Sequence, residues 1–129
     1  MKEKVATGLP DSSAPSEWAI KADNILYTVH WACLPDGTCS IGDIREQTRI
    51  TLENLKRAVE AAGGTMADVV QVQVYITERE NFQGMTEVYR GFFEPLYPNR
   101  ATIVAGIMVR GGLIEIMARA HIPPGPGAR

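Results

Sequence analysis

Two residues of opposite charge lie inside the most apolar part of the chain. Arg100 opens the run RATIVAGIMV, and Glu115 lies within the following run LIEIMA. A guanidinium group binds a carboxylate through two parallel hydrogen bonds, a geometry that a lysine does not offer. A carboxylate can orient a water molecule and accept its proton. Arg100 and Glu115 are therefore the first candidates for chemistry.

An ordinary surface role explains the same two residues equally well from the pattern alone. In the segment 113–122, alternate residues from Ile114 to Ile122 are apolar and form the predicted core face. Glu115 and Arg119 lie on the opposite, mixed face, where they could pair with each other in solvent. Arg100 would then only cap the end of a strand.

The elements that position these residues follow from hydrophobic periodicity and turn residues. Strands are expected at 18–21, 25–34, 69–76, 101–109 and 113–122, with a short one at 4–6. A first helix is expected from the capping box at Asp43 and Glu46 to about Ala62, before Gly63 and Gly64. A second helix is expected at 81–93, before Pro95 and Pro98.

The apolar faces of these elements can also be predicted. The first helix buries a stripe made of Ile44, Thr48, Thr51, Leu52, Leu55, Val59 and Ala62. In the strand 69–76, Val70, Val72, Val74 and Ile76 face the core, with Gln71 and Gln73 opposite. The order strands, helix, strand, helix, two strands predicts an α+β fold with both helices on one face of a sheet. The other face is left for water or another subunit.

The last two strands are expected to form a hairpin through the turn 109–112. In that hairpin Glu115 would lie opposite Gly106, and Arg100 would be roughly 20 Å farther along. The two charges would not meet, so we expect a bend or a second chain to complete any shared site. A structure with both groups solvated and facing nothing would contradict this hypothesis.

Composition excludes several classes of function. The 129 residues suit a single domain, and the net charge of −2, without a basic stripe, argues against a nucleic-acid partner. Without a long apolar run or a signal core, we expect a cytoplasmic protein that does not contact a membrane. Cys33 and Cys39 are expected as free thiols, with a disulfide or a metal role as the alternative. No spacing predicts a metal site.

The segment from Pro98 to Ile116 resembles the signature of the RidA/YjgF family of reactive intermediate deaminases. The matching residues are Pro98, Arg100, Ala101, Ile103, Gly106, Met108, Ile114, Glu115 and Ile116. Asn99 departs, because the family usually has a small residue there. The segments GDIREQTRITLENLKRAVEAAGG, ADVVQVQVYIT and NFQGMTEVYRGFF are similar to the family's first helix, next strand and second helix. The resemblance extends from about Ala14 to Ile122.

The resemblance implies a chorismate-mutase-like fold over residues 1–129, with a mixed sheet, two helices on one face and a loose tail from about 123. It also implies a homotrimer with a central barrel and ligand clefts between subunits. The implied activity is hydrolysis of enamines and imines, such as 2-aminoacrylate and 2-aminocrotonate, to a 2-keto acid and ammonia. No cofactor or metal is implied. Arg100 would hold the substrate carboxylate, Glu115 the attacking water, and Thr102 would lie at the cleft wall.

Several positions depart from the family pattern where a substrate is expected to bind. Ser16, Val29 and Thr86 stand where many members have Tyr, Ser and Asn, and His30 and Trp31 replace Gly and Gln. These changes predict a larger or differently shaped substrate. A buried, hydrogen-bonded histidine is the alternative for His30, and packing is the alternative for Trp31.

Two other functions remain open at this point. The first is a non-catalytic trimer that binds or senses a carboxylate through Arg100. The second is the family's older description as a ribonuclease or translation inhibitor, against which the acidic balance of the chain argues.

Overall fold

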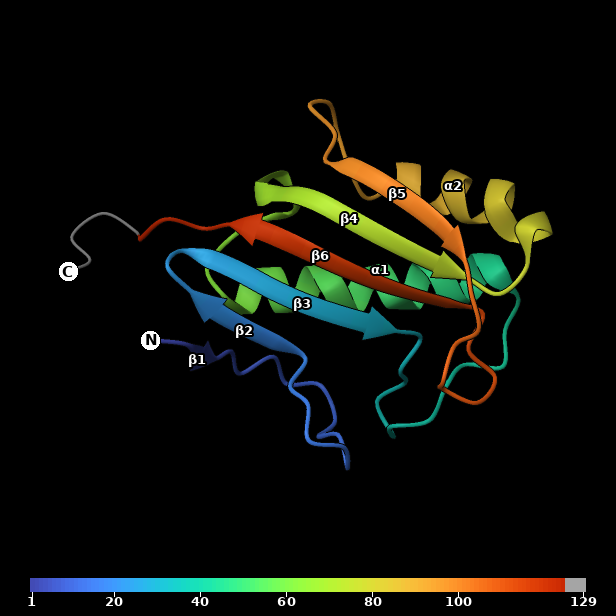
Figure 1. Ribbon diagram of the computed structural model, residues 1–129, viewed down its shortest axis with the longest axis horizontal. Coiled ribbons are helices and arrows are strands. Elements are labelled where there is room, and N and C mark those ends of the chain that lie inside the picture. The colour runs from blue at the N-terminus through green and yellow to red at the C-terminus, as the bar shows by residue number, and fades with distance from the viewer. Residues whose placement is uncertain (125–129) are drawn as a thin grey trace.

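The computed structural model describes residues 1–124 and shows a six-stranded mixed sheet with both helices on one face (Figure 1). The strands are β1 (Glu3–Lys4), β2 (Ala19–Ala22), β3 (Ile25–Trp31), β4 (Val69–Ile76), β5 (Asn99–Val104) and β6 (Ile114–His121). The helices are α1 (Ile44–Ala61) and α2 (Phe82–Arg90), with 3₁₀ turns η1 (Met66–Asp68) and η2 (Arg79–Asn81). The predicted α+β arrangement is confirmed. Of the expected loose tail, residues 125–129 lie outside the described part of the chain.

The order of strands in the sheet is β1-β2-β3-β6-β4-β5, so the prediction of a hairpin between the last two strands is wrong. Strand β4 lies between them, antiparallel to β6 and parallel to β5. A parallel pair needs a crossover connection, and α2 supplies it between β4 and β5. Strand β6 takes the central place because Ile114, Ile116, Ala118 and Ala120 are all buried under the helices.

Helix α1 forms the centre of the core, as its sequence predicts. The Asp43 carboxylate accepts a hydrogen bond from the Glu46 amide at 3.0 Å, but the Glu46 side chain pairs with Arg49 instead of returning to the cap. The helix ends before Gly63, whose φ of +94° favours glycine. The predicted apolar stripe is buried, apart from a partly buried Ala62.

The alternation predicted for β4 holds only from Val72 onward. Val69 is buried, whereas Val70 is 52% exposed, because the pairing with β6 shifts register between Val69 and Gln71. Such an irregularity places an extra residue in one strand and turns the preceding side chains over. The expectation that Val70 faces the core is therefore wrong.

Helix α2 lies close to α1 at Gly84. A Cβ atom at Gly84 would lie 3.0 Å from Cγ2 of Ile44, a distance that would force the neighbour to shift. Together the two helices cover one face of the sheet, and the opposite face carries no element in Figure 1. The residues on this open face are Tyr27, Val29, Trp31, Gln71, Gln73, Tyr75, Glu115, Met117 and Arg119.

Candidate active site

Arg100 lies on the helix side of the sheet, where α2 holds its guanidinium group. It pairs in register with the buried Val72, and residues that pair across neighbouring strands point to the same face. One guanidinium nitrogen donates to Thr86 Oγ1 at 3.2 Å. The guanidinium carbon lies 4.7 Å from the ring centroid of Tyr89 and 5.5 Å from that of Phe82. Such cation–π contacts orient the plane of the group.

This arrangement leaves Arg100 able to bind an anion. A guanidinium has five N–H donors. Within residues 1–124, Thr86 Oγ1 and the more weakly accepting Met85 Sδ, at 3.8 Å, each take one hydrogen bond from it. The remaining donors are free for a carboxylate. Arg100 is therefore a positioned cation and does more than cap a strand.

Glu115 lies on the open face of the sheet, in register with Tyr75 on one side and Trp31 on the other. Its carboxylate is half-buried, and this burial raises its pKa above the ordinary value. The predicted surface pair with Arg119 is not found, because Arg119 donates to Gln71 Oε1 at 2.5 Å. A carboxylate with a raised pKa is a better proton acceptor near neutral pH, which suits a general base.

A cavity of about 440 Å³ lies beside Glu115. Its wall brings together four residues that the sequence singled out, Glu115, Ser16, Val29 and Trp31, and adds Trp18. Ser16 is exposed at the rim, and Val29 lies on the open face of β3. The cavity is thus built by the N-terminal loop, β3 and β6.

Two more of the predicted binding residues lie with Arg100 instead. Thr86 is its hydrogen-bond partner, and Thr102 lies two residues along β5, on the same face, in register with Val74. Apart from His30, the predicted site residues therefore form two groups. The Arg100 group contains Arg100, Thr86 and Thr102, and the Glu115 group contains Glu115, Ser16 and Val29.

The two groups do not meet within one chain. Arg100 pairs with Val72 and Glu115 with Tyr75, on strands that lie on opposite sides of β4. The two residues are thus about 10 Å apart along the strands and about 10 Å apart across them. Their side chains also point to opposite faces of the sheet. One chain therefore holds two half-sites.

His30 lies in the core rather than in the cleft where the sequence analysis expected it. Its side chain is fully buried, and Nε2 lies 2.6 Å from Thr28 Oγ1. That hydroxyl donates its only hydrogen to the Trp18 carbonyl at 2.8 Å, so it must accept from His30 and Nε2 carries the proton. Burial lowers the pKa of His30 to about 3, which keeps the ring neutral. The alternative of a hydrogen-bonded core histidine fits this placement.

Two side-chain amides, one buried (Gln47) and one partly buried (Asn54), anchor the loops beside the Glu115 group, and neither was predicted from the sequence. Gln47 donates to the Ser40 and Gly111 carbonyls at 3.0 Å each and accepts from the Leu113 amide at 2.9 Å. Asn54 donates to the Cys33 carbonyl at 2.9 Å, at the end of β3. The sequence signal that could have identified Gln47 is its position on the buried side of an amphipathic helix, where a polar side chain needs hydrogen-bond partners.

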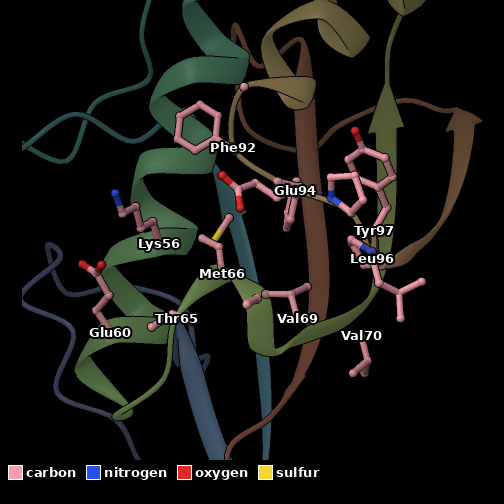
Figure 2. A pocket seen from close by; sticks show the side chains of 15 residues that line it. Lys56, Glu60, Thr65, Met66, Val69, Val70, Phe92, Glu94, Leu96 and Tyr97 are labelled. Carbon is pink, nitrogen blue, oxygen red and sulfur yellow. The ribbon is translucent and has the colours of Figure 1, made fainter.

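A larger cavity, of about 710 Å³, lies away from all of these residues. Figure 2 shows Lys56 and Glu60 of α1 on one wall, with Val70, Leu96 and Tyr97 on the other. Leu96 is 97% exposed, so this cavity is an open surface hollow. None of the predicted site residues lines it. Within residues 1–124, no cluster of His, Cys, Asp and Glu suits a metal ion, and no helix is long and apolar enough to cross a membrane.

Comparisons with known proteins agree with this fold. The family model described as Endoribonuclease L-PSP matches residues 9–122. The RutC family protein PH0854 of Pyrococcus horikoshii is 38% identical over 124 residues, covering 94% of this chain and 98% of the relative. The mitochondrial protein mmf2 of Schizosaccharomyces pombe is 34% identical, covering 79% of this chain and 83% of the relative.

Solved structures share the architecture. The Rid family protein YyfA of Yersinia pestis, a protein of unknown function, has a TM-score of 0.88 at 28% identity. The match covers 95% of this chain and 100% of that protein. TdcF of E. coli, solved with bound serine, has a TM-score of 0.84 at 26% identity and covers 94% of this chain and 99% of its own. The extent of these matches and the Arg100 and Glu115 motif show that the chain belongs to the RidA/YjgF family.

Proposed function

We propose that the protein is a cofactor-free hydrolytic deaminase of reactive enamines and imines, which it converts to 2-keto acids and ammonia. The observation that carries the proposal is the presence of two separate half-sites on the chain. Arg100 is held by α2 with donors to spare, and Glu115 is a half-buried carboxylate with a raised pKa beside a cavity. These are the two groups that hydrolysis of an imino acid needs.

A second copy of the chain would bring the half-sites together. We propose a homotrimer in which the open faces of three sheets form a central barrel and the Arg100 group of one copy faces the Glu115 group of the next. The open face supports this arrangement, because it carries exposed apolar side chains such as Tyr27 and Met117, at 44% and 37% exposure. Apolar residues gathered on one uncovered face are typical of an interaction surface.

The reaction follows from the chemistry of the two groups. Arg100 binds the substrate carboxylate through two hydrogen bonds and thereby fixes the neighbouring C=N carbon. Glu115 orients a water molecule, which attacks that carbon while its proton passes to the carboxylate. Glu115 then returns its proton to the nitrogen of the resulting carbinolamine. It takes up the hydroxyl proton as the C–N bond breaks to give the 2-keto acid and ammonia, and releases that proton to solvent. An enamine substrate first takes up a proton at carbon to become the imine.

The charges around the half-sites support this assignment. The charged residues that line the cavity are Asp11, Glu17 and Glu115, all of them acidic. A negatively charged wall favours binding of a protonated, cationic imine and disfavours binding of a carboxylate. The substrate carboxylate therefore binds to Arg100. That the similar TdcF was solved with serine supports binding of a small amino-acid-like molecule on this fold.

Two alternatives are separated by experiment. A non-catalytic, carboxylate-binding trimer would use Arg100 in the same way, and the changes at Ser16 and Thr86 favour it. The description of the family model raises ribonuclease activity, but the net charge of −2 removes the main electrostatic contribution to RNA binding. We also expect a cytoplasmic location, although the relative mmf2 is named as mitochondrial.

A coupled assay tests the proposal. A pyridoxal-phosphate threonine dehydratase generates 2-aminocrotonate in solution, and formation of 2-ketobutyrate is followed with wild type, Arg100→Ala and Glu115→Gln. We expect acceleration by the wild type and its loss in both variants. Saturable binding of 2-keto acids that depends on Arg100, without any acceleration, would support the sensing alternative. Cleavage of RNA that depends on Glu115 would support the ribonuclease.

A further inference from the structure

Both tryptophans of the chain lie in the wall of the cavity beside Glu115. Trp18 and Trp31 line this cavity of about 440 Å³, together with Val29 and Val109. Cavities of this size are in the range of about 300–1,000 Å³ that holds drug-sized ligands. A four-carbon imino acid would leave much of the space and the apolar wall unused.

The aromatic wall is rigid before any ligand arrives. Trp18 Nε1 donates to the Pro10 carbonyl at 2.8 Å, and its ring stacks on the buried His30, with centroids 5.6 Å apart and planes 4° apart. The Trp31 ring lies against Trp18 at 5.7 Å, tilted by 41°. Preorganised apolar surface binds a ligand at a lower entropic cost than a flexible one. His30 is thus a positioning residue that supports Trp18 from the core.

We propose that the natural substrates are 2-imino acids with a branched aliphatic or aromatic side chain, which packs against Trp18 and Trp31. The inference rests on the proposed deaminase function and specifies its substrate class. The substrate carboxylate goes to Arg100 of a second copy, because the charged residues of this cavity wall are all acidic. The C=N carbon lies near Glu115, and the side chain extends from there into the aromatic part of the cavity.

The test compares imines of different size made in the same way. A flavin-dependent amino-acid oxidase converts L-leucine, L-phenylalanine or L-alanine to its imine, and hydrolysis is followed with wild type, Trp31→Ala and Tyr97→Ala. Tyr97 is an exposed aromatic residue of the separate surface hollow in Figure 2 and serves as the matched control. We expect kcat/KM at least about tenfold higher for the two larger imines, the usual effect of burying one apolar side chain. Trp31→Ala should lower kcat/KM for the two larger imines much more than for the alanine imine and so remove this preference, and Tyr97→Ala should behave as wild type.

The outcomes separate this inference from the proposed function. Equal acceleration of all three imines by the wild type, or an equal loss on all three in Trp31→Ala, would overturn the substrate class and leave the deaminase intact. No acceleration of any imine would overturn both. Quenching of tryptophan emission gives a second readout, because both fluorophores line the cavity. 4-Methyl-2-oxopentanoate should saturate the signal at a concentration at least about tenfold lower than pyruvate does.

The two cysteines carry a separate inference that does not depend on the activity. Cys33 and Cys39 form an antiparallel β-bridge. The flanking hydrogen bonds run from the Leu34 amide to the Thr38 carbonyl at 2.8 Å and from the Ser40 amide to the Ala32 carbonyl at 2.9 Å. Cys33 and Cys39 are therefore a non-hydrogen-bonded pair, whose Cα atoms are about 4.5 Å apart and whose side chains are close together. That separation lies within the range of disulfides.

We infer that Cys33 and Cys39 form a reversible disulfide that responds to the redox state of the surroundings. Both are free thiols here, and Cys33 lines the cavity with the two tryptophans. A small disulfide such as oxidised glutathione would act as the oxidant. One cysteine attacks it to give a mixed disulfide, the second displaces glutathione, and two glutathione thiols are released for one intramolecular S–S bond.

Mass spectrometry and thiol titration test this inference. After incubation with oxidised glutathione, we expect wild type to lose both titratable thiols and the mass of two hydrogen atoms, reversibly with dithiothreitol. The Cys39→Ser and Cys33→Ser variants show whether the remaining cysteine instead carries a glutathione adduct. Persistence of both thiols, or adducts and intermolecular dimers in the wild type, would overturn the inference.

Discussion

Mild acid should destabilise the protein through His30. Burial lowers the pKa of this histidine from 6.5 to about 3, so the unfolded chain binds a proton between these values that the folded chain does not. The stability contributed by the neutral ring is present above pH 6.5 and is lost as the pH falls. Each full pH unit below 6.5 then costs about 1.4 kcal/mol, or about 2 kcal/mol in all between pH 7 and pH 5.

Urea unfolding at pH 7, 6 and 5 measures this effect, with tryptophan emission as the signal because Trp18 stacks on the ring of His30. The protein concentration is held constant, since an oligomer would make stability concentration-dependent. The chain has only two histidines, so wild type is compared with His30→Gln and His121→Gln. His121 is exposed on β6 and provides the matched control.

The quantity to compare is the difference in free energy of unfolding between wild type and variant at each pH, because carboxylates that titrate in this range affect both proteins equally. The advantage of wild type over His30→Gln should shrink by about 2 kcal/mol between pH 7 and pH 5. The curve for His121→Gln should follow that of wild type. Parallel curves for wild type and His30→Gln would refute the reasoning, because they would mean that the imidazole binds its proton equally well in the folded chain.

Three further predictions follow from the site and the helix cap. Arg100→Lys keeps the charge but loses one of two charge-assisted hydrogen bonds, so kcat/KM for 2-aminocrotonate should fall by about 10- to 150-fold. The control Arg45→Lys, at an exposed position, should leave kcat/KM unchanged. Equal activity of both variants would argue against bidentate binding. Because burial raises the pKa of Glu115, the acid limb of the pH profile of kcat/KM should lie above pH 4.5. The folded chain then binds this proton more tightly than the unfolded chain, so the stability that Glu115 contributes at low pH should be lost as the pH rises. Urea unfolding measures this trend, which Glu115→Gln should abolish. Asp43→Ala removes the side chain that caps α1 and should lower the free energy of unfolding by about 1 kcal/mol without changing activity; a loss of activity at equal stability would contradict a purely structural role.

Most secondary structure could be predicted because its signals are local. The Asp43 cap, the apolar stripe of α1 and the alternation from Val72 to Ile76 each depend on residues within one or two turns or along one strand. The failures lie where a neighbouring strand decides the outcome. Val70 turned outward because β4 shifts register against β6, and no periodicity within β4 predicts that shift.

The candidate site could be predicted only in part. Arg100 and Glu115 could be predicted from their residue types and from the resemblance to a family. The separation of the predicted residues into two groups could not be foreseen, because it depends on β4 lying between β5 and β6. The aromatic contacts that hold Arg100 likewise require the crossover that lays α2 beside β5.

The sequence by itself determined which segments form helices and strands, which residues can do chemistry, and the family. The tertiary structure decided which of those residues lie close together. His30 shows the physical reason most directly. Its type suits a proton-transfer group as well as a core residue. Its position in β3 places the side chain on the helix-covered face of the sheet, where burial keeps the ring neutral and Trp18 stacks on it. Strand order depends on burying the apolar faces of all elements at once, and that is a property of the whole chain rather than of any segment.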